Sequence, residues 1–251
     1  MERFNIGRVV GLTFSVFARN AAVFLPLAAL FMAPVLIVNL LGAHGAVPMS
    51  GALRQPSLST IVANLESIGQ NFGLFTLCSY FVQAAVAGNI NSSGSSAQFG
   101  ESLSIAVQNA VPIITISVLS VLGTMLGLML LVVPGLILAL AWSAVIPVKV
   151  AENSTIIDSF RRSMMLTKGY RLQILLLWLM YFVLLIAVTA IADFALGISS
   201  STRSEVLNSP PILLWNWAER VVIATLTAVG AAATYIELKQ VKESAGAEQP
   251  A

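Results

Sequence analysis

The side chains that could support acid–base, nucleophilic or metal chemistry are few in this 251-residue chain. It has one histidine, His44, and one cysteine, Cys78. Ser50 follows His44 in a segment rich in glycine, alanine and proline, which gives no reason for the two side chains to be aligned. The sequence contains no His-Glu-x-x-His, no Gly-x-Ser-x-Gly and no glycine-rich phosphate loop. We therefore expect a protein that is not an enzyme and that holds no metal and no cofactor.

Three charged residues lie in otherwise apolar stretches near the C-terminus: Asp193, Glu219 and Arg220. A charge at the centre of a membrane costs about 2.5–3.5 kcal/mol on insertion scales, so such residues usually have a partner or a function. Trp215 and Trp217 precede the second and third of them, and tryptophan favours the membrane interface. We expect an ion pair between Asp193 and Arg220 near the outer interface. A proton-coupled or substrate-binding role is the alternative.

A basic amphipathic helix is predicted between Asn153 and Gly169. Thr155-x-x-Asp158 is a capping signal, and Lys168-Gly169 is a stop signal. Ile157, Phe160 and Met164 form an apolar stripe. Four basic residues are predicted to contact lipid headgroups at this surface: Arg161, Arg162, Lys168 and Arg171. A plain topogenic anchor is the simpler interpretation, and recognition of a specific lipid or partner is the other.

Composition decides the solvent around these residues. Of the chain, 57% is hydrophobic and 10% is charged, with a mean hydropathy of +0.89, far from the soluble norm of about 25% charged residues. Between Glu101 and Lys149 there are 47 residues without a formal charge, about twice the length that one helix needs to cross a bilayer. The chain must fold back, and Val133-Pro134-Gly135 is the predicted break. A net charge of +2 gives no indication of nucleic-acid binding.

The predicted fold is all-α, with six transmembrane helices. Charge-poor stretches of suitable length are Ala21–Gly42, Phe72–Asn89, Val111–Val133, Gly135–Val150, Leu172–Ala195 and Ile212–Ile236. The first is too long for the apolar region of a signal peptide and is read as a retained span. The second is the weakest, because Gln83 interrupts it.

Basic residues orient these spans. Ten of the thirteen fall on one predicted side of the membrane: Arg3, Arg8, Arg19, Lys149, Arg161, Arg162, Lys168, Arg171, Lys239 and Lys242. Because cytoplasmic loops carry an excess of Lys and Arg, both termini are predicted to be cytoplasmic.

A degenerate threefold repeat is a further interpretation. Amphipathic stretches at Ile6–Asn20, Gly100–Asn109 and Ser154–Tyr170 each enter a span, with predicted hinges at Arg19-Asn20, Gln108-Asn109 and Lys168-Gly169-Tyr170. The units are 1–91, 92–150 and 151–245 of one membrane domain, followed by a tail at 246–251 that is expected to be disordered. Chance rhythm in the hydropathy is the alternative.

Small residues at four-residue spacing predict close helix packing. They are Gly123 and Gly127 in one span, and Ala224, Ala228 and Ala232 in the last. Whether the facing helix belongs to the same chain or to another copy is left open by this pattern.

Several segments of the second half resemble the YciC-like bacterial membrane proteins. They are Pro134-Gly135, Val145-Ile146-Pro147-Val148, Val150-Ala151-Glu152, Ser159-Phe160-Arg161-Arg162-Ser163, Leu166-Thr167-Lys168-Gly169 and Ala233-Thr234-Tyr235-Ile236-Glu237-Leu238-Lys239. That family is similar to the membrane domain fused to some glycerophosphodiester phosphodiesterases. The resemblance implies a six-helix inner-membrane protein; the catalytic phosphodiesterase domain is missing, so that activity is not implied.

These observations favour a non-enzymatic structural or accessory factor of the bacterial inner membrane, linked to membrane lipid. The alternative is a small-molecule or lipid transporter. A transporter should show a polar cavity near mid-bilayer that Gln83, Asn39 or Asp193 reaches, whereas an accessory protein should show a dry bundle or a lipid-filled groove.

Overall fold

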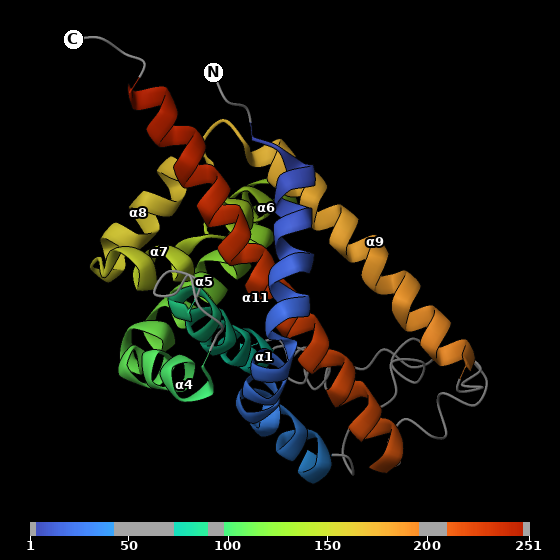
Figure 1. Cartoon of the computed structure of the whole chain (residues 1–251). Coiled ribbons are helices and arrows are strands. Elements are labelled where there is room, and N and C mark those ends of the chain that lie inside the picture. The colour runs from blue at the N-terminus through green and yellow to red at the C-terminus, as the bar shows by residue number, and fades with distance from the viewer. Residues whose placement is uncertain (1–3, 43–72, 90–97, 196–209, 248–251) are drawn as a thin grey trace.

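The computed structural model describes residues 4–42, 73–89, 98–195 and 210–247, and every regular element in those ranges is a helix. The helices are α1 (Ile6–Gly42), a helix over residues 73–89, α4 (Phe99–Gln108), α5 (Ala110–Leu130), α6 (Val132–Ala141), α7 (Val145–Glu152), α8 (Ile156–Thr167), α9 (Arg171–Ala195) and α11 (Pro210–Ala247). Figure 1 shows the start of α1 and the end of α11 at the same end of the molecule.

Five of the described helical segments are long and apolar enough to cross a membrane. They are Ile6–Leu41, Ala110–Leu130, Val133–Glu152, Arg171–Ile191 and Pro210–Ser244. The chain is therefore an all-α polytopic membrane protein. The predicted second span corresponds to the helix over residues 73–89, which is not among these five segments.

Three helix breaks in the middle of the chain share one cause. Each new helix begins so that a proline is its third residue: Pro112 in α5, Pro134 in α6 and Pro147 in α7. Proline lacks an N–H group and its ring disfavours helix one turn earlier, whereas the first turn of a new helix needs no such donor. The breaks therefore lie at Asn109, Leu131 and residues 142–144, three or more residues before the proline.

The break predicted at Val133-Pro134-Gly135 is thus displaced. Leu131 has extended dihedral angles (φ −163°, ψ 141°), while Pro134 and Gly135 are already helical. The predicted span Gly135–Val150 is also not one helix, because a turn at residues 142–144 separates α6 from α7.

Two glycines allow α5 and α6 to pack closely after this break. A Cβ atom on Gly127 would lie 2.8 Å from the Cα atom of Gly135, and one on Gly123 would overlap the indole ring of Trp142. Both positions therefore exclude any larger residue unless the hairpin opens.

The long helix α11 runs through the centre of the bundle (Figure 1). It lies antiparallel to α1, because the Asn5 amide bonds the Glu237 side chain near one end and the Trp217 indole bonds the Met32 carbonyl near the other. Ala224, Ala228 and Ala232 are buried in the cluster that α11 forms with α1 and the helix over residues 73–89. In this part of the bundle the alanine face is packed within the same chain.

Helix α9 diverges from the rest of the bundle toward its C-terminal end (Figure 1). Tyr181 attaches it: the hydroxyl donates to Thr13 Oγ1 at 2.9 Å, and the ring packs on Gly230. Beyond Tyr181, large apolar side chains such as Phe182 and Ile186 are more than half exposed. Such a surface suits lipid contact.

The predicted hinges differ among the three amphipathic segments. Asn109 separates α4 from α5, and Gly169 lies between α8 and α9 with φ of +95°, a conformation that favours glycine. The hinge at Arg19-Asn20 is wrong, because α1 is one helix of 37 residues. Pro26 and Pro34 lie inside α1 without ending it, and the Asn20 side chain donates to the Val16 carbonyl inside the helix.

The C-terminal boundary also differs from the prediction. Helix α11 continues to Ala247, so residues 246 and 247 of the predicted tail are helical. Residues 248–251 lie outside the described part of the chain.

Candidate functional site

Within residues 4–42, 73–89, 98–195 and 210–247, no group of three or more His, Cys, Asp or Glu side chains could hold a metal ion. Cys78 is buried in the apolar cluster with Phe24 and Met32, and it is there a packing residue. His44 and Ser50 lie outside the described residues.

Two carboxylates, Glu237 in α11 and Glu152 at the end of α7, have partners from distant segments. We call the group Asn5, Arg8, Glu152, Arg162, Tyr235 and Glu237 the charged end. Glu237 is only 3% exposed; it accepts from the Asn5 amide at 3.1 Å, and the Arg8 guanidinium lies 3.6 Å away. Because α11 supplies Glu237 and the start of α1 supplies its partners, the carboxylate joins these two helices.

Glu152 has a comparable environment at the end of α7. It accepts from the Tyr235 hydroxyl at 3.1 Å, and Arg162 Nε lies 3.3 Å from its carboxylate. Tyr235 belongs to α11 and Arg162 to α8, so Glu152 holds three helices together. This assigns Arg162 a structural contact beside any contact with lipid.

The connection between α7 and α8 is well defined. Asn153 adopts left-handed dihedral angles (φ 44°, ψ 36°), and Lys149 Nζ donates to the Ser154 carbonyl at 2.6 Å. Thr155 then caps α8 by accepting from the Asp158 amide, as the sequence predicted.

Helix α8 turns three hydroxyl side chains toward the protein, beside the buried Leu166. Ser159, Ser163 and Thr167 are fully buried, and their hydroxyls donate to the carbonyls of Thr155, Ala141 and Ser163 respectively. Small side chains at four-residue spacing let α8 lie close to α6 and α7.

The opposite face of α8 carries large apolar and basic side chains. Ile157 is 79% exposed and Met165 50%, and Met164, Arg161 and Lys168 are also exposed. We call this set the α8 outer face. The predicted apolar stripe is thus divided. Ile157 and Met164 face outward, while the Phe160 ring makes an edge contact with the Trp142 ring, with 5.1 Å between the ring centroids.

The four basic residues predicted to contact headgroups are therefore not equivalent. Arg161 and Lys168 are exposed, Arg162 pairs with Glu152, and Arg171 is half-buried with its Nε atom inaccessible. Lys242 adds a cation beside Lys168, because its Nζ donates to the Lys168 carbonyl at 3.1 Å. The exposed positive charge is thus concentrated near the C-terminal end of α8.

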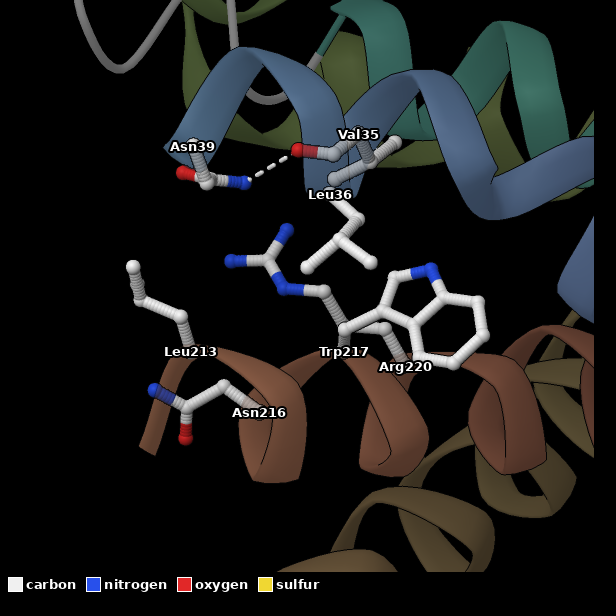
Figure 2. Close-up of a pocket in the computed structure, with 7 residues that line it drawn as sticks. All are labelled: Val35, Leu36, Asn39, Leu213, Asn216, Trp217 and Arg220. Atoms are coloured by element: carbon white, nitrogen blue, oxygen red, sulfur yellow. Dashed lines mark hydrogen bonds between the residues drawn. The ribbon is translucent and has the colours of Figure 1, made fainter. Parts of the chain in front are cut away.

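A small cavity lies at the other ends of α1 and α11. It has a volume of about 60 Å³ and is lined by Val35, Leu36, Asn39, Leu213, Asn216, Trp217 and Arg220. Figure 2 shows the Arg220 side chain extending from α11 into the space below α1, with Asn39 on the opposite helix. We call this space the Arg220 cavity.

The ion pair predicted between Asp193 and Arg220 stays a prediction, because the Asp193 side chain lies outside the described part of the structure. Among the described side chains, the Arg220 guanidinium lies 5.8 Å from the centroid of the Phe75 ring, a cation–π contact. Glu219 does not line the cavity and has an interaction of its own.

The residues proposed for a transport pathway do not meet in the described structure. Asn39 lines the Arg220 cavity near the end of α1, whereas Gln83 is half-buried in the helix over residues 73–89 and lines no part of it. A volume of about 60 Å³ admits a few water molecules or a small ion, which is far below the 300–1,000 Å³ of an organic ligand site.

Sequence reasoning did not assign roles to Glu152, Tyr235, Glu237 or Arg8. A carboxylate next to the end of an apolar span was the available signal, because Glu152 and Glu237 each end such a stretch. Glu152 and Tyr235 are 83 residues apart in sequence, and Glu237 and Asn5 are 232 residues apart. No local pattern therefore identifies these partners.

Comparison of the chain with protein-family models, with curated proteins and with solved structures finds no match.

Proposed function

We propose that this chain is a non-enzymatic accessory protein of the bacterial inner membrane that binds anionic lipid headgroups through the α8 outer face. One observation carries the proposal: α8 exposes large apolar side chains together with arginine and lysine, while Leu166 and three hydroxyl residues fill its buried face. In a helix packed on a water-soluble protein the large apolar residues face the core. Exposed apolar and basic side chains on one face suit a helix whose outer side meets the boundary between headgroups and acyl chains.

The charges on this face favour an anionic lipid, because the exposed Arg161 and Lys168 outnumber the exposed carboxylate of Asp158. Arg161 and Lys168 flank the exposed methionines, and each basic residue near an anionic membrane surface contributes about 1 kcal/mol. Lys242 lies beside Lys168 and extends the basic area onto α11. The positive-inside pattern supports the cytoplasmic leaflet as the location, with both termini in the cytoplasm. The resemblance to YciC-like membrane proteins supports the bacterial inner membrane.

Lipid binding by matched variants tests the proposal. The full chain is purified in detergent and titrated with phosphatidylglycerol or phosphatidylcholine, and bound lipid is counted by native mass spectrometry. Because two charges are removed, the Arg161→Gln/Lys168→Gln double variant should bind phosphatidylglycerol about thirtyfold more weakly. Its thermal stability should stay close to that of the wild type, since both side chains are exposed.

Arg162→Gln is the control, because Arg162 is next to Arg161 but pairs with Glu152. It should lower thermal stability while changing phosphatidylglycerol binding less than the double variant. Unchanged lipid preference in the double variant would refute the proposal.

Topology can be tested with cysteines in a Cys78→Ala background. The exposed Met165 is a suitable position on α8, whereas Ser163 is fully buried and would resist labelling on either side. A cysteine at position 165 should be protected from an impermeant reagent added outside cells. A cysteine at Ser201 should be labelled, and the reverse pattern would refute the orientation.

A transporter is the second candidate, because Asn39 and Arg220 line a polar cavity between two helices. Cysteines placed along α1 from Asn39 back to Asn20 distinguish the two functions. A transport pathway should give a stripe of labelling by a water-soluble reagent that continues toward the middle of α1. An accessory bundle should give labelling that stops near Asn39.

A further inference from the structure

The Arg220 cavity places a guanidinium where the described structure offers it no carboxylate. The described ion pairs are Arg8 with Glu237 and Arg162 with Glu152, both at the charged end. Arg220 instead lies over the Phe75 ring, and none of the described residues that line its cavity is acidic. Guanidinium groups carry five N–H donors in a planar fork, and a ring face satisfies none of them by a conventional hydrogen bond.

The surrounding side chains add polar groups without adding charge. The Asn39 Nδ2 group donates to the Val35 carbonyl at 2.7 Å, which leaves its second N–H. Asn216 contributes another amide from α11, one turn before Arg220. Trp217 is fixed by its bond to the Met32 carbonyl at 2.9 Å, so the wall beside the guanidinium is held in place. One cation and two amides thus line a space with otherwise apolar walls.

We propose that the Arg220 cavity binds a phosphate group. A volume of about 60 Å³ has room for one tetrahedral oxyanion and not for a sugar or an acyl chain. Arginine pairs with phosphate through two parallel N–H donors, and the amide N–H groups can donate to the remaining oxygens. The site does not depend on the α8 outer face, since it lies at the opposite ends of α1 and α11.

Two sources can supply the same chemistry: the phosphodiester of a phospholipid, or free inorganic phosphate. Asn39 is three residues from the end of α1 and Arg220 is about 15 Å along α11 from its start. The cavity is therefore near helix ends, within reach of lipid headgroups and of small ions.

The experiment uses the full chain with Arg161→Gln/Lys168→Gln, so that the α8 outer face contributes little to lipid binding. Phosphatidylglycerol and diacylglycerol, which lacks the phosphate, are titrated separately and counted by native mass spectrometry. In a second arm, thermal stability is measured in inorganic phosphate and in chloride at equal ionic strength. We expect phosphatidylglycerol to bind in preference to diacylglycerol, or phosphate to raise the melting temperature.

Variants then locate the site. Arg220→Gln should weaken whichever ligand binds by about tenfold, because a charge-assisted bidentate contact is lost. Arg220→Lys should retain part of the affinity. Leu213→Trp fills the cavity without touching the charge and should weaken binding similarly, so the test holds even if Arg220→Gln folds poorly. Arg19→Gln, an exposed arginine on α1, is the matched control and should leave binding unchanged.

A response in the lipid arm identifies a phospholipid headgroup, and a response in the phosphate arm alone identifies a free anion. The proposal is overturned if diacylglycerol binds as well as phosphatidylglycerol and phosphate has no effect. It is also overturned if both Arg220→Gln and Leu213→Trp leave binding unchanged.

Discussion

The charged end and the Arg220 cavity differ in the partners that the described structure gives to their charged side chains. At the charged end, each buried or half-buried carboxylate has a guanidinium within 3.6 Å and a hydrogen-bond donor from another helix. In the cavity, a guanidinium faces amides and an aromatic ring. A charge that is neutralised by its own chain stabilises helix packing, whereas a charge without such a partner keeps its capacity for a ligand.

The largest effect on stability is expected at Glu237. Glu237→Gln keeps an oxygen that can accept from the Asn5 amide but removes the negative charge beside Arg8, and losing a hydrogen-bonded charge at a buried position costs about 1–3 kcal/mol. Thermal unfolding in detergent measures the loss. Glu243→Gln, an exposed carboxylate on the same helix, is the control. Equal melting temperatures in the two variants would contradict a structural role for Glu237.

A smaller loss is expected at Glu152, because part of its environment is exposed. Tyr235→Phe removes one hydroxyl donor and should cost about 1 kcal/mol. Arg162→Gln removes the cation from the same carboxylate. Since the two residues share a partner, their double variant should depart from additivity. Strict additivity in melting data would show that Tyr235 and Arg162 act independently.

The smallest effect on stability is expected at Arg220. Without added ligand, Arg220→Gln loses a cation–π contact with Phe75, which is worth about 0.5–1 kcal/mol at exposed sites. A loss as large as that of Glu237→Gln would remove the contrast between the two regions. Asp193→Asn extends the test: if Asp193 is the partner predicted from the sequence, its combination with Arg220→Gln should be less harmful than the sum of the single variants.

The elements of this fold were largely predictable, because hydropathy and charge mark where helices begin and end. Asn109 and Gly169 were identified as boundaries, and Thr155 as the cap of α8. The position of the break near Pro134 was harder to predict from the sequence. Proline affects the carbonyl one turn earlier, so the break lies at Leu131 while the proline itself is helical.

The site residues were harder to predict from the sequence. The basic character of α8 was visible, but which arginine is free depends on Glu152, ten residues before Arg162 and across a turn. The inward face of α8 was not expected to carry three hydroxyl residues beside Leu166, since a helical pattern shows two faces without saying which one meets protein. In a membrane protein the apolar face can point to lipid, and only tertiary packing decides between the two.

The depth of the α8 outer face in the bilayer decides whether this surface meets lipid or water. A nitroxide is attached to a cysteine at Met165, and separately at Glu243, in the Cys78→Ala chain reconstituted in bilayers that contain phosphatidylglycerol. Collision rates with oxygen, which concentrates in the bilayer, and with a water-soluble nickel complex are then compared. At position 165 we expect a higher collision rate with oxygen and a lower collision rate with the nickel complex than at position 243. Equal exposure to the nickel complex at both positions would place the α8 outer face in water and contradict the proposed lipid-binding role.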